Sequence, residues 1–327
     1  MSISENHGGL YKNLEELRKT EGTCDNNFFR SLGYDYLYVS EGHNLLKLIQ
    51  TFQIIKDINH PIVVHVNTEK GHGYQPAIND KENWHFTAPF FIETGMRKES
   101  FADELYSSIT ADFLLEKMKN DKRIVAISSG TPTVMGFTAQ KRKIAGEQFV
   151  DVGSAEEQAV AMASGIAKAG DRPVWGVYSC FITRAFDQLQ QVLCINNNPA
   201  IILVFWGSLT SMNDVTHLCW WDIPMTINIP NLICLAPSNK EEYVSMLEWS
   251  LIQTEHPVCI RVPFGRVVHS SIPITYNNSK LTRFEIRHRG KDVALIGVGT
   301  FIYLAEQVAE KLKVFLALML PLSTHDF

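Results

Sequence analysis

Glu156 is the residue whose type and position most clearly indicate chemistry. It lies in Phe149-Val-Asp-Val-Gly-Ser-Ala-Glu-Glu-Gln-Ala-Val160, which predicts a buried strand ending at Gly153, a polar turn and then a helix of small residues. A carboxylate at such a turn faces the crevice in which open α/β sheets bind ligands. In a dry pocket it can hold or transfer a proton, whereas the plainer alternative is that it complements the dipole of the helix that it starts.

Aromatic and basic residues follow the next predicted strand, in Tyr178-Ser-Cys-Phe-Ile-Thr-Arg-Ala-Phe-Asp187. A flat ring such as Phe181 can stack on a heterocyclic ligand, although packing in the core is the commoner role of a phenylalanine. Arg184 follows Phe181 at helical spacing, and a surface cation is the alternative interpretation of this residue.

Three further positions carry groups suited to anion binding or proton transfer. Lys70 lies in His65-Val-Asn-Thr-Glu-Lys-Gly-His-Gly-Tyr-Gln-Pro-Ala77, where neighbouring glycines let the backbone approach a phosphate closely. His85 follows this loop, and His217 ends the segment Asn213-Asp-Val-Thr-His217. An imidazole can transfer protons near neutral pH, but a solvent-exposed linker histidine is an alternative interpretation of His85.

The elements that must position these residues alternate between strands and helices, which predicts an α/β fold with a doubly wound parallel sheet. Residues 1–40 are expected to form loop and short helix, and 77–100 and 271–285 to form linkers. The apolar residues from Leu45 to Ile55 fall largely on one helical face. We expect strands at 62–66, 123–128, 173–178, 200–205, 232–235 and 258–262, a strand that begins a further unit near 292–300, and helices at 101–118, 155–169, 184–196, 241–253 and 303–312.

Composition bounds the class of protein. A chain of 327 residues with 45% hydrophobic content predicts about two globular domains. The net charge of -5 gives no support for a nucleic-acid partner. Apolar runs such as Ala200 to Trp206 are far shorter than the roughly 20 residues of a spanning helix, so no membrane association is expected. The polar start of the chain shows no signal peptide, and we expect a soluble, cytoplasmic protein.

Taken together, these segments resemble the 1-deoxyxylulose-5-phosphate synthase and transketolase group of thiamine diphosphate enzymes. The resemblance implies thiamine diphosphate and Mg²⁺ as cofactors and small molecules as substrates. The implied reaction is a transfer that joins pyruvate to an aldehyde phosphate with loss of CO₂, and that feeds isoprenoid and thiamine precursor synthesis. It also implies three domains: residues 1–95 as the end of a diphosphate-binding domain, 96–270 as a pyrimidine-binding domain and 271–327 as the start of a C-terminal domain.

The resemblance also implies roles for the residues above. Glu156 corresponds to the glutamate that hydrogen-bonds the aminopyrimidine ring, and His217 and His85 correspond to active-site histidines. The implied cofactor-binding residues are Lys70, near the phosphates, Phe181, packed on the pyrimidine, and also Tyr178 and Arg184.

Two departures from the family pattern concern ligands. The family's Gly-Asp-Gly and later Asn, which hold the metal through hard oxygen atoms, are not present, and Met1-Ser-Ile-Ser-Glu-Asn6 matches the segment just after them. We therefore expect no metal ligands here and impaired diphosphate binding by this chain alone. Two arginines that bind substrate phosphate in the family correspond to Trp206 and Phe264, neither of which can replace a guanidinium, so another acceptor is possible.

The end of the sequence departs as well. After Lys313 the residues show no family pattern, but synonymous codons for Met319 onward can be chosen so that a shifted frame encodes Asn-Ala-Thr-Val-Ile-Asn-Pro-Arg-Phe, which resembles the family. We therefore expect a frameshift and a fragment truncated at both ends, which sequencing of the gene tests.

Two alternatives remain beside an impaired synthase-like enzyme. One is a split transketolase-like subunit completed by a separate N-terminal chain, and the other is a non-catalytic relic or interaction module. Family members dimerise through these domains, so a homodimer is also expected if the chain folds.

Overall fold

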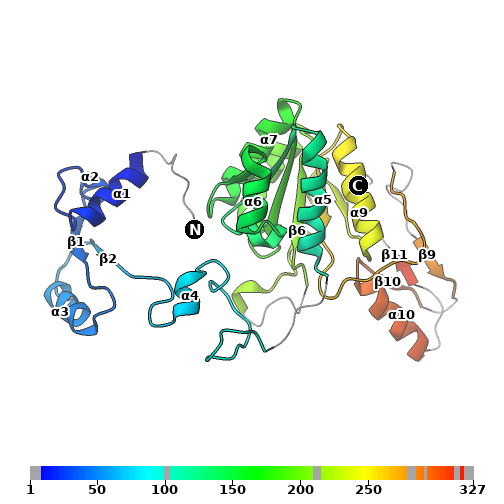
Figure 1. Ribbon diagram of the computed structural model, residues 1–327. Helices are drawn as coiled ribbons and strands as arrows, with labels where there is room; N and C mark the ends of the chain where they lie inside the picture. The colour runs from blue at the N-terminus through cyan, green and yellow to red at the C-terminus, as the bar shows by residue number, and fades with distance from the viewer. Residues whose placement is uncertain are drawn as a thin grey trace. The chain divides into compact units, whose positions relative to one another are not determined.

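A computed structural model describes residues 9–98, 104–208, 215–277, 285–290, 293–312 and 317–319 (Figure 1). The chain divides into two compact units, Met1–Ser100 and Phe101–Phe327. Each unit has its own sheet, and each is described by itself below.

The first unit is built around two parallel strands, β1 (Asp35–Val39) and β2 (Ile62–Val66), in which Asp35 lies opposite Ile62. The expectation of only loop and short helix before residue 40 is therefore wrong. Only Tyr36 and Val39 of β1 are buried, so its apolar signal is short and its pairing partner lies far along the chain. The helices of this unit are α1 (Gly9–Lys19), α2 (Phe28–Ser31), α3 (Leu45–Ile55) and α4 (Gln75–Asn79).

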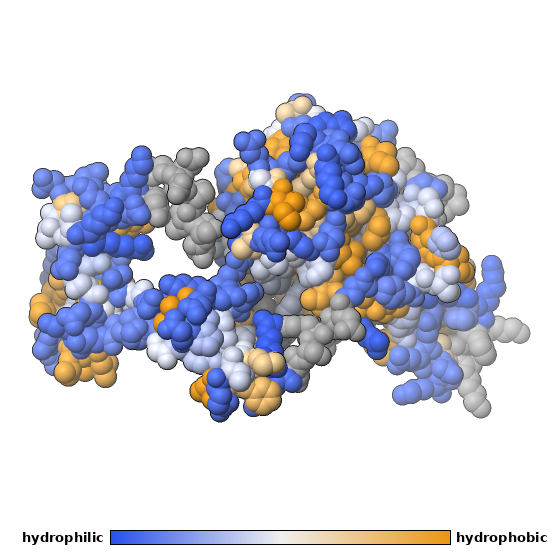
Figure 2. Space-filling view, viewed as in Figure 1, coloured by the Kyte–Doolittle hydropathy of each residue, from blue (hydrophilic) through white to orange (hydrophobic). Residues whose placement is uncertain are grey.

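Helix α3 forms where the sequence predicts it, because Asn44 caps its first turn by accepting hydrogen bonds from the backbone of Leu46 and Lys47. Its apolar side chains remain at the surface, and Figure 2 shows them as a hydrophobic area over the helix. Leu46 is 71% and Ile54 76% exposed, and no residue of α3 is buried. Parallel sheets are normally covered on both faces, so this small sheet has less cover than its type requires.

The second unit contains a six-stranded, all-parallel sheet, which confirms the predicted fold class. The strand order is β4-β3-β5-β6-β8-β7, so the chain winds outward in both directions. Five of the strands lie within one residue of their predicted bounds. The strand predicted to end at Gly153 is also present, as β4, and it ends at Asp151. The six strands are β3 (Ile124–Ser128), β4 (Phe149–Asp151), β5 (Arg172–Tyr178), β6 (Ile201–Phe205), β7 (Ile233–Leu235) and β8 (Val258–Arg261).

Helices cover both faces of this sheet (Figure 1). One predicted helix, 184–196, is wrong in type, because the chain forms a 3-10 turn at Ile182–Ala185 and then a π-helix at Gln188–Cys194. The apolar spacing there is compatible with an ordinary helix, so the pattern carries no signal for the wider turns. The α-helices are α5 (Tyr106–Asn120), α6 (Ala139–Ala145), α7 (Glu156–Lys168), α8 (Asp222–Thr226) and α9 (Lys240–Ile252), and further 3-10 turns span Pro132–Met135, Gly146–Gln148 and Val215–His217.

A separate three-stranded sheet follows, with the order β10-β11-β9. Strands β10 and β11 are parallel, whereas β11 and β9 are antiparallel. Its elements are β9 (Glu285–His288), β10 (Leu295–Gly297), α10 (Phe301–Leu312) and β11 (Ala317–Met319). The predicted strand is present in shorter form, and the predicted helix begins two residues earlier than expected.

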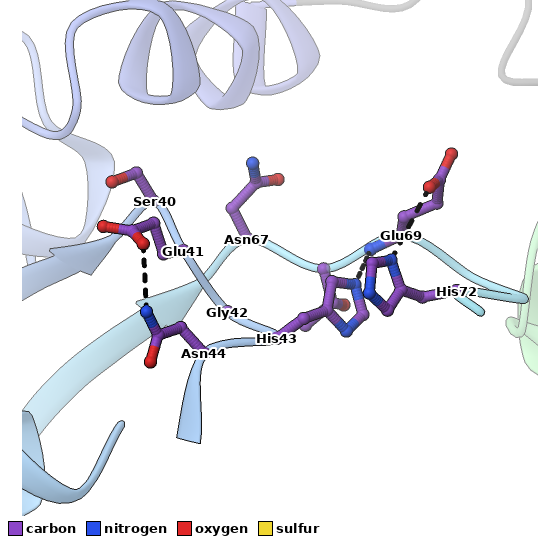
Figure 3. A pocket seen from close by; sticks show the side chains of 9 residues that line it. Ser40, Glu41, Gly42, His43, Asn44, Asn67, Glu69 and His72 are labelled. Atoms are coloured by element: carbon purple, nitrogen blue, oxygen red, sulfur yellow. Dashed lines mark hydrogen bonds and ion pairs between the residues drawn. The ribbon is translucent and has the colours of Figure 1, made fainter. Parts of the chain in front are cut away.

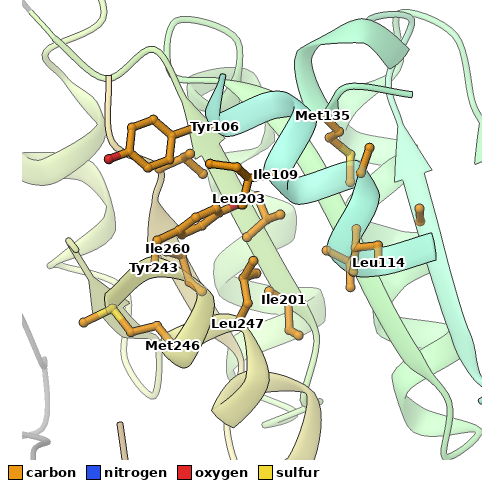
Figure 4. Packing of buried hydrophobic residues seen from close by; sticks show 14 of the residues in the cluster. Tyr106, Ile109, Leu114, Met135, Ile201, Leu203, Tyr243, Met246, Leu247 and Ile260 are labelled. Atoms are coloured by element: carbon orange, nitrogen blue, oxygen red, sulfur yellow. The ribbon is translucent and has the colours of Figure 1, made fainter. Parts of the chain in front are cut away.

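Alternate residues of the central strands fill two separate cores. Ile201 and Leu203 pack with α5 and α9 on one face, as Figure 4 shows, whereas Ile202 and Val204 pack with α7 on the other. On the first face the buried hydroxyl groups of Thr110 and Tyr243 lie 2.6 Å apart and satisfy each other. The sheet is therefore a fixed middle layer, and side chains at its edge have little freedom to shift.

A buried ion pair fixes the end of β6. Asp222 Oδ2 accepts a hydrogen bond of 2.6 Å from Arg261 Nε, and the two side chains are only 3% and 15% exposed. A Cβ atom on Gly207 would lie 2.6 Å from each of these two atoms, so the chain leaving β6 passes directly against the pair. A residue with any side chain could not follow this path without moving the pair.

We predict that Arg261→Met lowers the free energy of unfolding by about 3–5 kcal/mol, because it leaves the Asp222 carboxylate buried and unpaired. Chemical denaturation followed by circular dichroism measures this change. The matched control is Arg123→Met, which removes an exposed partner of Asp121 and should leave the denaturation midpoint unchanged. Equal midpoints for Arg261→Met and the wild type would show that the pair contributes nothing.

A second prediction concerns a close backbone approach. Gly136 has φ of 77°, and a Cβ atom there would lie 2.1 Å from the carbonyl oxygen of Ser107. Gly136→Ala should therefore destabilise the second unit by about 2–4 kcal/mol through overpacking and strain. Gly165 lies in the middle of α7, and a Cβ atom there would meet no other atom within 4 Å. Gly165→Ala should therefore stabilise the second unit by about 0.5–1 kcal/mol. Thermal unfolding of both variants tests the contrast, and a stable Gly136→Ala protein would contradict it.

Candidate functional site

The candidate site lies at the carboxyl edge of the six-stranded sheet. Because all six strands are parallel, their carboxyl ends meet along one edge, where open α/β sheets bind ligands. Tyr178 is the last residue of β5, Trp206 follows β6 directly, and Phe264 lies shortly after β8. Glu156 begins α7, which follows β4. Because of the strand order, these side chains follow one another along the edge in the spatial order Glu156, Tyr178, Trp206, Phe264.

Glu156 is a buried carboxylate with a basic partner. The residue is 2% exposed, and its Oε2 atom lies 3.2 Å from Arg184 Nη1. The Arg184 side chain is 53% exposed, so the pair reaches from the interior to solvent. Arg184 is thus an exposed cation, as its alternative interpretation expects, and it also contacts a buried carboxylate. The position of Glu156 at the start of α7 adds the favourable field of the helix dipole to this contact.

Aromatic rings after β5 are in contact with one another at the same edge of the sheet. The Phe181 ring lies 5.6 Å from the Tyr178 ring and 5.6 Å from the His217 ring, both in edge-to-face geometry. All three residues are half-buried. Burial raises the pKa of Tyr178 to about 12, so its phenol remains a neutral hydrogen-bond donor at physiological pH. The structure thus brings together five of the residues singled out in the sequence: Glu156, Tyr178, Phe181, Arg184 and His217.

Buried polar atoms at the same edge have no hydrogen-bond partner among the described residues. Ser179 Oγ, just after β5, and Thr131 Oγ1, in the loop after β3, are two such atoms. Burying a polar group without a partner costs free energy, so such atoms mark places where a ligand or water can supply the missing bond. A buried carboxylate, a half-buried ring and uncommitted hydroxyl groups are a suitable set for a flat heterocycle with ring nitrogen atoms.

Lys70 and His85, the remaining predicted site residues, lie in the first unit. Lys70 follows β2, and its Nζ atom lies 2.5 Å from His85 Nδ1. Both side chains are exposed, so the contact forms a small basic group at the surface of this unit.

The same unit has a hollow that the sequence analysis did not identify, with a volume of about 540 Å³ (Figure 3). The rings of His43 and His72 stack across it with centroids 3.7 Å apart, and the backbone N–H of Glu69 donates to His43 Nε2 at 2.6 Å. A Cβ atom on Gly42 would lie 2.1 Å from the carbonyl oxygen of Asn67. The Gly42-His-Asn44 sequence, separated from the end of β1 by two residues, is the signal that the sequence offers, but it indicates a site only if β1 is known to be a strand.

The described ranges contain neither a cluster of metal ligands nor a membrane-spanning helix. Over these residues, no three side chains of His, Cys, Asp or Glu gather closely enough to hold a metal ion. Among the helices that the structure describes, none combines the length and the apolar character needed to cross a membrane.

Comparisons with known proteins identify both units. The family model for the transketolase pyrimidine-binding domain matches residues 105–267, which include the whole candidate site of the second unit. A family model for 1-deoxy-D-xylulose-5-phosphate synthase matches residues 1–68. The two matched segments belong to the two separate units of the chain.

The curated relatives of this chain are named 1-deoxy-D-xylulose-5-phosphate synthases. The 1-deoxy-D-xylulose-5-phosphate synthase of Halothermothrix orenii is 33% identical over 285 residues, which are 87% of this chain and 44% of that protein. The synthase of Natranaerobius thermophilus is 34% identical over 286 residues, which are 87% of this chain and 45% of that protein. The chain thus spans about half the length of the curated relatives it matches.

Solved structures show the same fold. A structure described as a split gene transketolase, inactive beta4 tetramer, aligns with a TM-score of 0.53 at 20% identity and covers 65% of this chain and 70% of that one. Transketolase from Leishmania mexicana aligns with a TM-score of 0.55 at 16% identity, covering 66% and 34%. The matched segments, together with the curated relatives, show that this chain belongs to the transketolase-like family of the 1-deoxy-D-xylulose-5-phosphate synthases.

Proposed function

We propose that the second unit binds the aminopyrimidine of thiamine diphosphate, and that the chain serves a synthase-like condensation of pyruvate with an aldehyde. The observation that carries this proposal is the buried Glu156 carboxylate at the carboxyl edge of the sheet, together with the half-buried Phe181 ring that follows β5 at the same edge. Both residues lie inside the segment matched to the pyrimidine-binding domain. When bound, the cofactor supplies a thiazolium carbon that can take up the two-carbon unit of pyruvate as CO₂ leaves.

Each residue of this edge has a role that follows from its contacts. Glu156 is buried, so in this proposal it holds a hydrogen bond to a pyrimidine nitrogen in a site that excludes water. Arg184 holds the Glu156 carboxylate in position from the solvent side. Phe181 packs on the heterocycle, and Tyr178 fixes the Phe181 ring through their edge-to-face contact. His217 contacts Phe181 on its other side and is assigned to proton transfer with the substrate.

The first unit is assigned to the phosphate end of the cofactor. Lys70 and His85 form a basic contact that suits a diphosphate oxygen, and we treat residues 1–95 as part of a diphosphate-binding domain. The described residues do not provide a cluster of carboxylate ligands for Mg²⁺, so no step is assigned to a metal held by this chain alone.

A complementing chain is the partner that best suits this arrangement. The chain spans 44% of the Halothermothrix orenii relative, and one neighbour in fold is described as a split gene transketolase. We propose that a second chain supplies the metal ligands, and that the sheet and α3 of the first unit bind it. A homodimer is the other assembly consistent with the family resemblance.

Titration calorimetry with thiamine diphosphate and Mg²⁺ tests the cofactor proposal. We expect weak binding by the wild-type chain alone, because no metal ligands are assigned to it, and a further loss of about tenfold or more in Glu156→Ala, because a hydrogen bond to a charged group contributes about 1.5–3 kcal/mol. Glu157→Ala is the matched control, since this neighbour is on the same helix but is not buried, and it should bind as the wild type does. Absence of binding by a folded wild-type chain, also when a chain carrying the metal motif is added, would instead support a relic without a working site.

Mixing experiments test the partner proposal. A chain carrying the Gly-Asp-Gly and Asn metal motif should sediment with this protein in analytical ultracentrifugation and should raise its affinity for thiamine diphosphate. Leu46→Glu, on the exposed face of α3, should weaken this association without unfolding the free chain, because Leu46 is 71% exposed there. Association that is unchanged by Leu46→Glu would mean that α3 is not the contact surface.

A further inference from the structure

Three rings at the carboxyl edge form a surface that shares Tyr178 with the proposed cofactor contacts and extends beyond them. Tyr178, Trp206 and Phe264, here called the aromatic row, follow three neighbouring strands of the sheet. The Trp206 ring lies 5.6 Å from each of the other two rings, with interplanar angles of 84° to Tyr178 and 62° to Phe264. All three residues are half-buried, so one side of the row packs on the core and the other side is accessible.

The middle ring of this row is held in an unfavourable backbone conformation. Trp206 has φ of 61°, in the left-handed region that bulky residues rarely adopt. The next residue, Gly207, lies against the buried Asp222–Arg261 pair, which leaves the chain no room to relax toward that side. Strain of this kind persists where the surrounding structure imposes it, and it is concentrated at sites that bind ligands.

Two arginines in the part of this edge that the structure describes are paired with carboxylates. Arg184 contacts Glu156, and Arg261 is paired with Asp222 beneath Gly207. Recognition of a phosphate group favours a guanidinium that can offer two parallel hydrogen bonds, which an aromatic ring cannot replace. Arg266, an exposed residue just beyond Phe264, is the remaining arginine close to the row in sequence.

We propose that the aromatic row receives the side chain of the acceptor aldehyde, and that this side chain is uncharged and apolar or aromatic rather than phosphorylated. The inference rests on the proposed two-carbon transfer, because it names the acceptor of that reaction. Trp206 and Phe264 are the residues that determine this specificity. The three rings are half-buried, so each keeps part of its surface exposed, and a flat apolar side chain gains most from packing on such surface.

Ligand-observed NMR and calorimetry on the full chain test the inference with two probes, benzaldehyde and glyceraldehyde 3-phosphate. Benzaldehyde should bind about tenfold or more tightly than glyceraldehyde 3-phosphate, since a matched apolar surface discriminates by this order. Inorganic phosphate should not compete with benzaldehyde. Tighter binding of glyceraldehyde 3-phosphate, or competition by phosphate that Arg266→Met abolishes, would overturn the proposal in favour of a phosphate site.

Variants of the row supply the second measurement. Phe264→Leu keeps an apolar side chain but removes the ring, and Trp206→Gly removes the ring while relieving the left-handed strain. Each should weaken benzaldehyde binding by about threefold to tenfold, whereas the matched control Arg266→Met should not. Circular dichroism verifies folding, and Phe264→Leu carries the test if Trp206→Gly does not fold. Unchanged benzaldehyde affinity in the folded ring variants would contradict the role of the row.

The cofactor titration separates this inference from the proposed function. Failure to bind thiamine diphosphate counts against the proposed function and removes the acceptor role of the row with it. A chain that binds thiamine diphosphate but prefers glyceraldehyde 3-phosphate over benzaldehyde would overturn this inference alone.

Discussion

The parallel pairing of β5, β6 and β8 is the constraint on which the candidate site depends. Because these neighbouring strands run in one direction, Tyr178, Trp206 and Phe264 emerge at the same edge although they are far apart in the sequence. Two close-packed cores hold the sheet from both faces, so the edge cannot shift to adapt to a ligand. Ligand preference at this edge is therefore decided by which side chains the strands deliver there.

Two ion pairs at this edge differ in how far their side chains are exposed to solvent. Glu156 is buried and meets an exposed Arg184, which keeps one end of the contact in water and limits its desolvation cost. Asp222 and Arg261 are both largely buried, and they set the path of the chain beside Trp206. One pair thus faces the proposed cofactor position, while the other supports the backbone that carries the aromatic row.

The two units differ in how completely their sheets are covered. The six-stranded sheet has helices on both faces, as parallel sheets require, whereas the two-stranded sheet of the first unit leaves the apolar side chains of α3 exposed. Apolar area of this kind on one helix marks a surface for association. The first unit therefore leaves an apolar helix face exposed among the described residues.

The sequence by itself determined the fold class, most strands of the second unit and the candidate residues, because buried strands of a parallel sheet are continuous apolar runs that local patterns reveal. It did not determine β1 or the π-helix at Gln188–Cys194, since the first has a short apolar signal and the second shares the spacing of an ordinary helix. Only the tertiary structure decided that Glu156 meets Arg184 and that Trp206 joins Tyr178 to Phe264. Such contacts join residues that are distant along the chain, and the strand order that brings them together is a property of the whole sheet.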